Sequence, residues 1–481
     1  MIRALCSSLV AVTLALTVGG CGSQTKWSTS SAEARRAFEE GVAHWEKFYY
    51  TEAAESFKQA IAADSMFAVA WGRLGLLHMY TLDETAARHD VTRALMLSSR
   101  ATEREQLLIR LWYYRVMYEN VRAAAVADSL IALYPKEAEA YLVRGQLYAG
   151  EKNIEAAVKM FERAVAADTG FALGVMSLGY AYSDLGEQDK AVSYMQRYIR
   201  MAPDAADPRA SYADILLRAG RYDEALEQFR ASLEHKPDYW YSVRQIGGVY
   251  ALHGRLADAR KEFDRSLTMV PAGSTTEALR LRLYAYLDMQ RGAYEEAVSK
   301  SREAVAIDSS LLGSAFQLSY ALAKLKRFAE AEECIRQSLE ELERKHQTDS
   351  PTMQGYHIMR ARVYTEEGRY DEALRACKSA LEYSSPQMRG EVYTQIARTY
   401  LAARQYEPSL DAVEGALGVN PNAPEALLIL TKVYNELGDR RMVIEVGDRL
   451  RTLWKDADPD FLPLRELHQL LGNRRTPRTG T

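Results

Sequence analysis

The segment "GRYDEALEQFRASLEHKP" (220–237) decides the fold, because its opening recurs further along the chain. "GRYDEAL" begins again at Gly368, 148 residues later. Written in rows of 34, the residues between the two copies place small, aromatic and turn residues in columns. Four periods leave twelve residues over, and two insertions account for them, "STTE" (274–277) and "HQTDSPTM" (346–353). We expect both insertions in loops, where added residues do not disturb packing.

Each row of 34 residues predicts two antiparallel helices. The row that starts at Ala172 has Gly179 in column eight, Tyr182 in column eleven, Gly186 in column fifteen and Ala191 in column twenty. Small residues at columns eight and twenty let the two helices approach, and long or aromatic residues fill the space beside them. Glycine at column fifteen ends the first helix, because it adopts positive φ without strain. A hairpin this small cannot bury its own apolar face, so the rows must stack.

The period, the columns of Gly, Ala, aromatic and Pro residues, and the tandem order resemble the tetratricopeptide repeat family. The resemblance covers about twelve units over residues 34–457 and implies an all-α solenoid, a right-handed superhelix of antiparallel helix pairs. The third unit departs from the pattern and keeps little but Tyr134 and Pro135. After the repeats, "DFLPLRELHQLL" (460–471) predicts an amphipathic capping helix within residues 458–472, and residues 473–481 predict a disordered tail.

The N-terminus predicts an export signal and a lipid anchor. Residues 1–20 have one charge, Arg3, followed by an apolar run too short for a good transmembrane helix. The run ends in "VGGC" (18–21), which resembles the bacterial lipobox and implies lipidation of Cys21; a signal peptide without lipid is the alternative. Residues 21–33 are then a tether, which spans at most about 40 Å. Ser30 and Glu33 have capping-box spacing before the first helix.

Composition and motifs exclude several classes of function. A net charge of −4 and a pI near 6.2 argue against a nucleic-acid partner. The chain has no H-E-x-x-H, no P-loop and no G-x-S-x-G motif, so we expect no enzyme, no cofactor and no metal. His44 and His78 share a column but belong to different units, which favours packing over shared ligation. Cys334 and Cys377 fit no zinc or redox spacing; two free thiols are expected, with a disulfide as the alternative.

The partner-binding residues are implied by the family resemblance. In this family the first helices of the units line a concave wall with columns two, five, nine, twelve and thirteen. In the middle of the chain these columns hold Tyr241, Arg244, Arg282, Tyr286, Met289, Phe316, Tyr320, Lys324, Arg362 and Arg398. An N-terminal part of the groove would comprise Phe38, Trp45, Leu76, Met79, Tyr80, Leu108 and Trp112. The alternative is that long side chains merely cover helix surfaces.

The two resemblances together imply a lipid-anchored scaffold of the bacterial cell envelope that binds protein or peptide partners. Gly22 in place of an Asp after the lipidated cysteine favours the outer membrane, with the solenoid facing the periplasm. Such a lipoprotein would belong to an outer-membrane assembly, secretion, pilus or polysaccharide-export complex. The alternative is a lipoprotein that binds glycan or regulates a cell-wall enzyme.

Overall fold

The computed structural model describes residues 27–81, 83–270, 273–309, 311–344 and 352–472, and this part of the chain is helical without strands. The predicted signal peptide and the predicted tail lie outside the described residues. Two short 3-10 helices, Ser98–Arg100 and Pro386–Met388, precede α5 and α21. In chain order the α-helices are α1 (Ala32–Glu46), α2 (Tyr50–Ala63), α3 (Ala68–Tyr80), α4 (Glu84–Leu97), α5 (Glu103–Val116), α6 (Asn120–Leu133), α7 (Ala138–Gly150), α8 (Ile154–Ala167), α9 (Ala172–Asp184), α10 (Gln188–Met201), α11 (Asp207–Arg218), α12 (Tyr222–His235), α13 (Trp240–Leu252), α14 (Leu256–Leu267), α15 (Ser274–Arg291), α16 (Tyr294–Ile307), α17 (Leu312–Lys324), α18 (Phe328–Arg344), α19 (Thr352–Glu367), α20 (Tyr370–Glu382), α21 (Arg389–Ala402), α22 (Tyr406–Val419), α23 (Pro424–Leu437), α24 (Arg440–Leu453) and α25 (Leu462–Gly472).

The helices from α1 to α24 pack as successive pairs, and column eight is where the two helices of a pair meet. A Cβ atom added to Gly145 would lie 2.4 Å from the Phe161 ring, and one added to Gly179 would lie 2.6 Å from Met195 Cε. In both pairs the glycine and its partner are separated by the same distance in sequence. The predicted role of the small columns is confirmed: they allow the helices to approach until a large side chain covers the glycine backbone.

The turn between the helices of a pair has left-handed backbone geometry at column fifteen. Six glycines there have φ between 73° and 87°, as predicted. The same geometry is kept where glycine is absent, at five residues with φ between 57° and 64°: Phe48, Tyr118, Lys152, Lys326 and Arg404. The stacked helices therefore impose the turn. In these five units a residue other than glycine adopts the left-handed backbone conformation, which costs about 1–2 kcal/mol.

Two predictions of local structure were wrong in detail, and a third is tested only in part. "STTE" (274–277) is not a loop insertion but the first turn of α15, which has 18 residues. Because four residues are close to one helical turn, the extension keeps the packing face of α15 in register. Of the second insertion, residues 346–351 lie outside the described residues, and the last two begin α19. Ser31, not Ser30, caps α1, with its hydroxyl accepting the Ala34 N–H at 3.1 Å.

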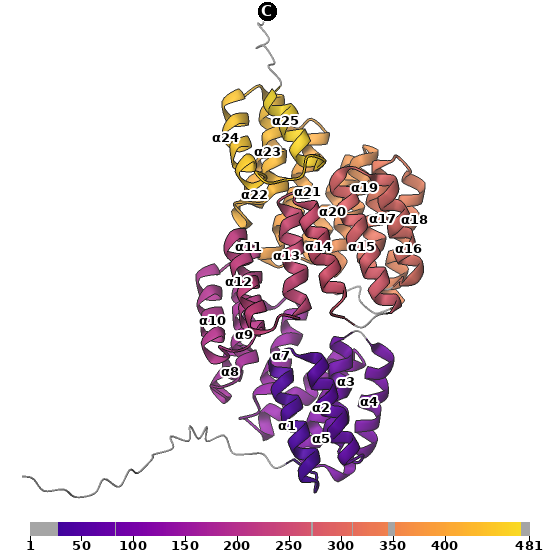
Figure 1. Ribbon diagram of the computed structural model, residues 1–481, viewed down its shortest axis with the longest axis vertical. Coiled ribbons are helices and arrows are strands. Elements are labelled where there is room, and N and C mark those ends of the chain that lie inside the picture. The colour runs from indigo at the N-terminus through magenta and orange to yellow at the C-terminus, as the bar shows by residue number, and fades with distance from the viewer. Residues whose placement is uncertain (1–26, 82, 271–272, 310, 345–351, 473–481) are drawn as a thin grey trace, which may run out of the picture.

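The odd-numbered helices form the inner side of the curved stack. Close backbone contacts link α7 to α9 and α9 to α11, and then join α15, α17, α19, α21, α23 and α25 in succession. In the described part of the chain, successive even-numbered helices approach each other far less, because they splay on the outside of the curve. Figure 1 shows the resulting coil, with α1–α5 at one end, α13–α15 in the middle and α23–α25 at the other end.

Successive turns of the coil touch each other, which the sequence analysis did not predict. Near the N-terminal end, the Tyr49 hydroxyl accepts the Ala206 N–H at 3.2 Å, and Lys236 Nζ bonds to Glu52 at 2.6 Å. Further along, Lys152 Nζ donates to the carbonyl of Glu382 at 2.7 Å. The turn is therefore about five or six units long, and units far apart in sequence lie side by side.

The C-terminal helix extends these contacts. Leu467 is fully buried, and Leu471 lies where a Cβ on Gly447 would meet it at 2.9 Å, so α25 covers the last pair. Arg465 on the same helix donates to the carbonyl of Arg291 on α15 at 2.8 Å. The predicted cap thus also joins the last unit to the eighth.

Gly254 lies at a contact between two successive turns of the coil. Its φ is 75°, and its carbonyl accepts the Asp458 N–H at 2.9 Å. A Cβ on Gly254 would lie 2.5 Å from the Phe461 ring. Glycine is needed here twice, for the backbone angle and for the contact with the following turn of the coil.

Residues 27–31 are fastened to the first three units, and we call this segment the N-terminal clasp. Trp27 packs edge-on against Phe38 with ring centroids 4.9 Å apart. The Ser28 N–H bonds to Glu105 on α5 at 2.8 Å, and the Thr29 hydroxyl donates to Asp64 at 2.6 Å. Residues 21–33 were predicted to form a tether, whereas residues from Trp27 onward belong to this clasp.

Candidate partner-binding wall

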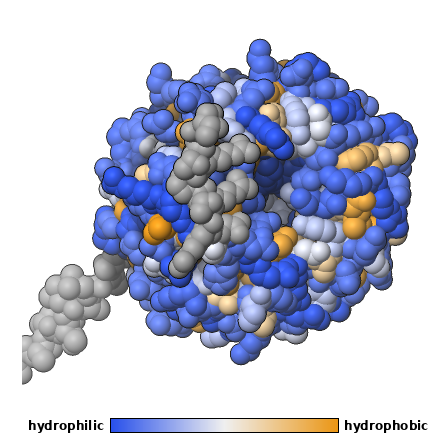
Figure 2. All heavy atoms as spheres, turned by 90° about the horizontal axis from the view of Figure 1, so that it is seen from above, coloured by the Kyte–Doolittle hydropathy of each residue, from blue (hydrophilic) through white to orange (hydrophobic). Residues whose placement is uncertain are grey.

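The predicted groove residues of the middle units lie on the odd-numbered helices from α13 to α21, and we call the surface that the odd-numbered helices present from α13 to α25 the inner wall. Figure 2, which views the coil from its C-terminal end, shows a hollow near the middle of that end, surrounded by a mostly hydrophilic surface. All eight residues of the predicted site are half-buried: Tyr241, Arg244, Arg282, Tyr286, Met289, Phe316, Tyr320 and Arg362. The structure therefore gathers them on one side of the coil but leaves none of them fully exposed.

Some of these side chains are held by the protein itself. Tyr241 donates its hydroxyl to Asp214 at 2.6 Å, and Tyr180 donates to the same carboxylate at 3.1 Å. Burial raises the pKa of Asp214, while the hydroxyl donors oppose the rise. Met289 and Phe316 pack against the core between α15 and α19. These residues support the reading in which long side chains cover the helices.

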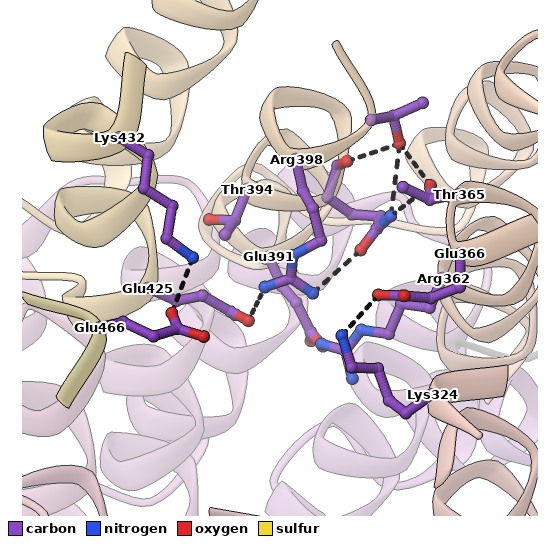
Figure 3. A network of polar contacts seen from close by, with 12 residues as sticks. Lys324, Arg362, Thr365, Glu366, Glu391, Thr394, Arg398, Glu425, Lys432 and Glu466 are labelled. Atoms are coloured by element: carbon purple, nitrogen blue, oxygen red, sulfur yellow. Dashed lines mark hydrogen bonds and ion pairs between the residues drawn. The ribbon is translucent and has the colours of Figure 1, made fainter. Parts of the chain in front are cut away.

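A ladder of ion pairs runs along the inner wall from α17 to α25 (Figure 3). Each rung joins a cation on one odd-numbered helix to a carboxylate on the next odd-numbered helix. The rungs are Lys324–Glu366 at 3.0 Å, Arg362–Glu391 at 3.1 Å, Arg398–Glu425, and Lys432–Glu466 at 2.7 Å. Arg362 and Arg398, predicted as groove cations, thus already have carboxylate partners.

The carboxylates of the ladder were not among the residues predicted from the sequence. Glu391 and Glu425 both occupy column two, and Arg362 and Arg398 both occupy column nine. The signal that could have revealed the ladder is this recurrence, a cation in column nine followed by an acid in column two of the next unit. These two columns come together only when neighbouring units stack with a particular rotation. The sequence pattern therefore predicts the ladder only if that rotation is known.

The predicted N-terminal groove was wrong for most of its residues. Phe38 and Trp112 are fully buried, and Leu76 and Leu108 are buried with them in the core of the first units. Trp112 lies over Gly72, where a Cβ would meet its ring at 2.6 Å. Phe38 is covered by the rings of Trp27, Phe57 and Phe67, whereas the large Trp112 side chain of the degenerate third unit fills the space over Gly72. Of this group, Tyr80 remains exposed.

The candidate metal and thiol residues are structural. His44 Nδ1 lies 3.4 Å from the Ser56 hydroxyl, and His78 Nδ1 lies 2.8 Å from Asp90, each within its own helix pair. In the described ranges no three His, Cys, Asp or Glu side chains are grouped as metal ligands. Cys334 and Cys377 are free thiols in separate units, as expected from the sequence. Burial raises the pKa of the Cys377 thiol to about 12.

A buried carboxylate lies at the base of α11, beside the contact between turns. Asp207 accepts hydroxyl hydrogen bonds from Tyr198 at 2.9 Å, Tyr239 at 2.8 Å and Ser211 at 3.3 Å. Burial raises the pKa of this carboxyl from 3.8 to about 6, and the three hydroxyl donors limit the rise. The site holds a negative charge without a cation among its hydrogen-bond partners, and sequence columns gave no sign of it.

Sequence models described as "Tetratricopeptide repeat" match residues 120–170, 153–208, 176–239 and 212–274, and further models of the same description match 312–341 and 364–433. Together they cover more than half of the chain. The chain belongs to the tetratricopeptide repeat family. Members of this family are scaffolds that bind protein partners, and the solenoid is typically not catalytic.

The curated relatives share only part of their length with this chain. It is similar to the human protein O-mannosyl-transferase TMTC1, with 26% identity over 42% of the chain and 23% of that protein. Superkiller complex protein 3 of Mus musculus is 25% identical over 48% of the chain and 15% of its own length. TPR repeat-containing protein YpiA of Bacillus subtilis (strain 168) is 20% identical over 58% of the chain and 71% of its length.

The chain is also similar to parts of solved structures, at low sequence identity. The structure of a human IFIT1 dimer with m7Gppp-AAAA is 16% identical and covers 81% of this chain and 90% of its own, with a TM-score of 0.43. The structure of MamA is 23% identical and covers 33% of this chain and 93% of its own, with a TM-score of 0.29. None of the helices described here is long and apolar enough to span a bilayer.

Proposed function

We propose that this protein is a lipid-anchored scaffold of the bacterial cell envelope that binds a protein or peptide segment along the inner wall between α13 and α19. The observation that carries the binding site is the composition of this wall. It presents half-buried tyrosines and arginines on four neighbouring odd-numbered helices, and such side chains dominate binding energy in protein interfaces. The wall lies on the inside of a coil whose end is hollowed.

The lipid anchor rests on the sequence "VGGC" at residues 18–21 after a leader with one charge and an apolar run. The N-terminal clasp limits the distance between a lipid anchor at Cys21 and the coil. Six peptide bonds join Cys21 to Trp27, and this segment reaches at most about 20 Å when fully extended. An anchor at Cys21 would hold the end of the coil that contains α1, α2 and α5 close to the membrane, with the C-terminal end furthest from it.

We assign the outer membrane, with the coil in the periplasm, because no Asp follows Cys21. A role in an assembly, secretion, pilus or polysaccharide-export complex is consistent with such a scaffold. We propose no catalytic step. The alternative of a glycan-binding lipoprotein has less support, because tyrosines such as Tyr182 and Tyr222 are buried and hydrogen-bonded within the coil.

The anchor is tested by expressing the wild type and Cys21→Ala in a Gram-negative host. The wild type should fractionate with the outer membrane and carry acyl mass on its mature N-terminus, and the variant should be released from membranes. Equal distribution of the two proteins without acyl mass would remove the anchor from the proposal.

The binding wall is tested by photo-crosslinking in the same host. A benzophenone amino acid replaces Tyr286 on α15 in one strain and the exposed Glu227 on the outer helix α12 in another. The inner position should yield a discrete crosslinked protein that the outer position does not. Crosslinks from the Glu227 position alone would indicate that the partner binds the convex face and would contradict binding along the inner wall.

A further inference from the structure

The loops between the first units lie at an end of the coil that no other turn covers. Contacts between turns follow one pattern in the described chain: a loop between two units contacts the turn within a unit of the preceding turn of the coil. The Ala206 N–H bonds to Tyr49 in this way, and the Glu382 carbonyl accepts from Lys152. The loops between the first four units have no preceding turn to contact. They therefore form a free face at the end of the coil that holds α1–α5 (Figure 1).

This end face is a single connected surface. Arg104 on α5 joins two of its parts, because its guanidinium lies 5.3 Å from the Trp27 ring centroid and its Nε donates to Glu137 at 2.7 Å. The Thr29 hydroxyl donates to Asp64 at 2.6 Å and so joins a third part. We define the end face as the N-terminal clasp, the loops 64–67, 98–102 and 134–137, and the adjoining ends of α4 and α6.

The end face exposes large hydrophobic side chains. Met96, near the end of α4, is 70% exposed, and Leu133, the last residue of α6, is 58% exposed. Among the described residues, only Val121 is a more exposed large hydrophobic residue than these two. Trp27 and Met66 lie on the same face and are half-buried. Apolar side chains gathered at a surface in this way mark a contact with another protein or with a membrane.

Two cations accompany these apolar side chains. Arg100 and Lys136 are exposed, one in the loop after α4 and the other in the loop after α6. Of the carboxylates nearby, Glu137 is paired with Arg104, and Glu103 is exposed. Cations beside exposed apolar groups suit a surface of anionic lipid headgroups, where each contributes about 1 kcal/mol of attraction.

The chain that precedes the described residues indicates what covers this face. Trp27 lies on the end face, and six peptide bonds connect it to Cys21. Those bonds span at most about 20 Å, and one headgroup layer of a bilayer is about 5–8 Å thick. A lipid on Cys21 therefore leaves the end face within about 15 Å of the headgroups, and the rest of the coil extends away from them.

We infer that the end face rests on a phospholipid bilayer, with Met96 and Leu133 among the headgroups and Arg100 and Lys136 against anionic ones. This inference rests on the proposed function, because the lipid anchor at Cys21 is what selects a membrane as the partner of this face. Apolar side chains that enter the interface and cations that remain at its surface are the usual pair of contacts between a peripheral protein and lipid. The long axis of the coil then points away from the membrane.

The test measures sedimentation of the Cys21→Ala chain with vesicles of phosphatidylethanolamine and phosphatidylglycerol. This chain carries no acyl group, so the contact made by the end face is measured apart from the anchor. The variant adds Met96→Gln with Leu133→Gln, and the matched control adds Leu437→Gln with Ile444→Gln. The control residues are 47% and 44% exposed on α23 and α24, near the opposite end of the coil.

The end-face variant should lower the fraction bound to vesicles, expressed as a partition coefficient, about fivefold or more, and the control about twofold or less. Both pairs are exposed, so the melting midpoints of the two variants should match that of the parent chain. Vesicles of phosphatidylcholine alone should bind the parent chain about threefold more weakly. Equal binding to the two kinds of vesicle would remove Arg100 and Lys136 from the contact.

The inference is overturned if the Cys21→Ala chain does not bind vesicles, or if the two variants lose binding equally. It is also overturned if the parent chain sediments without vesicles and the end-face variant does not, because the face would then join two copies of the chain. Acyl mass at Cys21 and the crosslink from Tyr286 are separate measurements. The anchor and the inner wall can therefore stand when the end face fails, and a missing acyl group would be detected independently of vesicle binding.

Discussion

Asp207 makes the stability of this protein depend on pH in an unusual direction. Its carboxyl titrates near 3.8 in the unfolded chain and at about 6 in the folded protein. Between these values the folded state binds the additional proton, so this residue destabilises the fold progressively as pH rises through about 6. At pH 7 the shift corresponds to a cost of about 3 kcal/mol, and about half of that remains at pH 5.

The perturbation is Asp207→Asn, which keeps the size of the side chain and removes its charge. Tyr198, Tyr239 and Ser211 can still bond to the amide, because their hydroxyls can rotate to donate or accept. Carboxyls that do not interact with Asp207 contribute equally in both proteins, so the difference in unfolding free energy reports Asp207 together with its charge coupling to Asp214. From pH 7 to pH 5 the wild type should gain about 1 kcal/mol relative to the variant.

Urea unfolding followed by circular dichroism at several pH values between about 5 and 7 provides the measurement. Asp189→Asn on α10 is the control, because Asp189 is an exposed aspartate and the substitution removes the same charge. A difference between wild type and Asp207→Asn that does not change with pH would refute the raised pKa. A difference of opposite sign would mean that an unrecognised cation compensates the carboxylate.

Three further predictions concern packing, turns and the inner wall. Ala225→Leu, at a fully buried small column, should cost about 1–3 kcal/mol in urea unfolding, while Glu227→Leu on the exposed face should change it by roughly 0.5 kcal/mol or less; the reverse order would contradict the assigned columns. Arg404→Gly should stabilise by about 1 kcal/mol, because Arg404 is exposed with φ of 58°, whereas Gly368→Ala should destabilise by a similar amount; thermal melts compare the two. Arg282→Met should raise the melting midpoint of the free protein, since it removes a buried charge without a partner, and a marked fall would show that Arg282 supports the fold rather than a ligand.

The sequence predicted the contacts between the two helices of a pair. Gly145 and Phe161 recur in the same columns of several units, and the contact between those columns is local, so one row is enough to predict it. The left-handed turn followed from glycine at column fifteen, but not its persistence at Tyr118 or Lys326. There the helix pair imposes the backbone angle, and residue preference alone does not reveal it.

The sequence did not predict contacts that depend on the accumulated rotation of several units. The bond between Lys236 and Glu52 exists because small rotations between units sum to one full turn of the coil. The same accumulated geometry decides which inner-wall cations find a carboxylate. Arg362 and Arg282 look alike as groove arginines in the sequence, yet the first has Glu391 within 3.1 Å and the second has none among the described residues.

The contacts between turns change how this array can fold and come apart. In a stack whose units touch only their neighbours, stability is a sum of nearest-neighbour interactions and the ends fray independently. Here Lys152 bonds to Glu382, which is 230 residues away, and Trp454 bonds to Leu252, which is 202 residues away. Such contacts form only after the units between them have stacked, so they add late steps of high contact order to folding. Loss of α25 would also release its bond to α15, so melting at one end of the chain is transmitted directly to its centre.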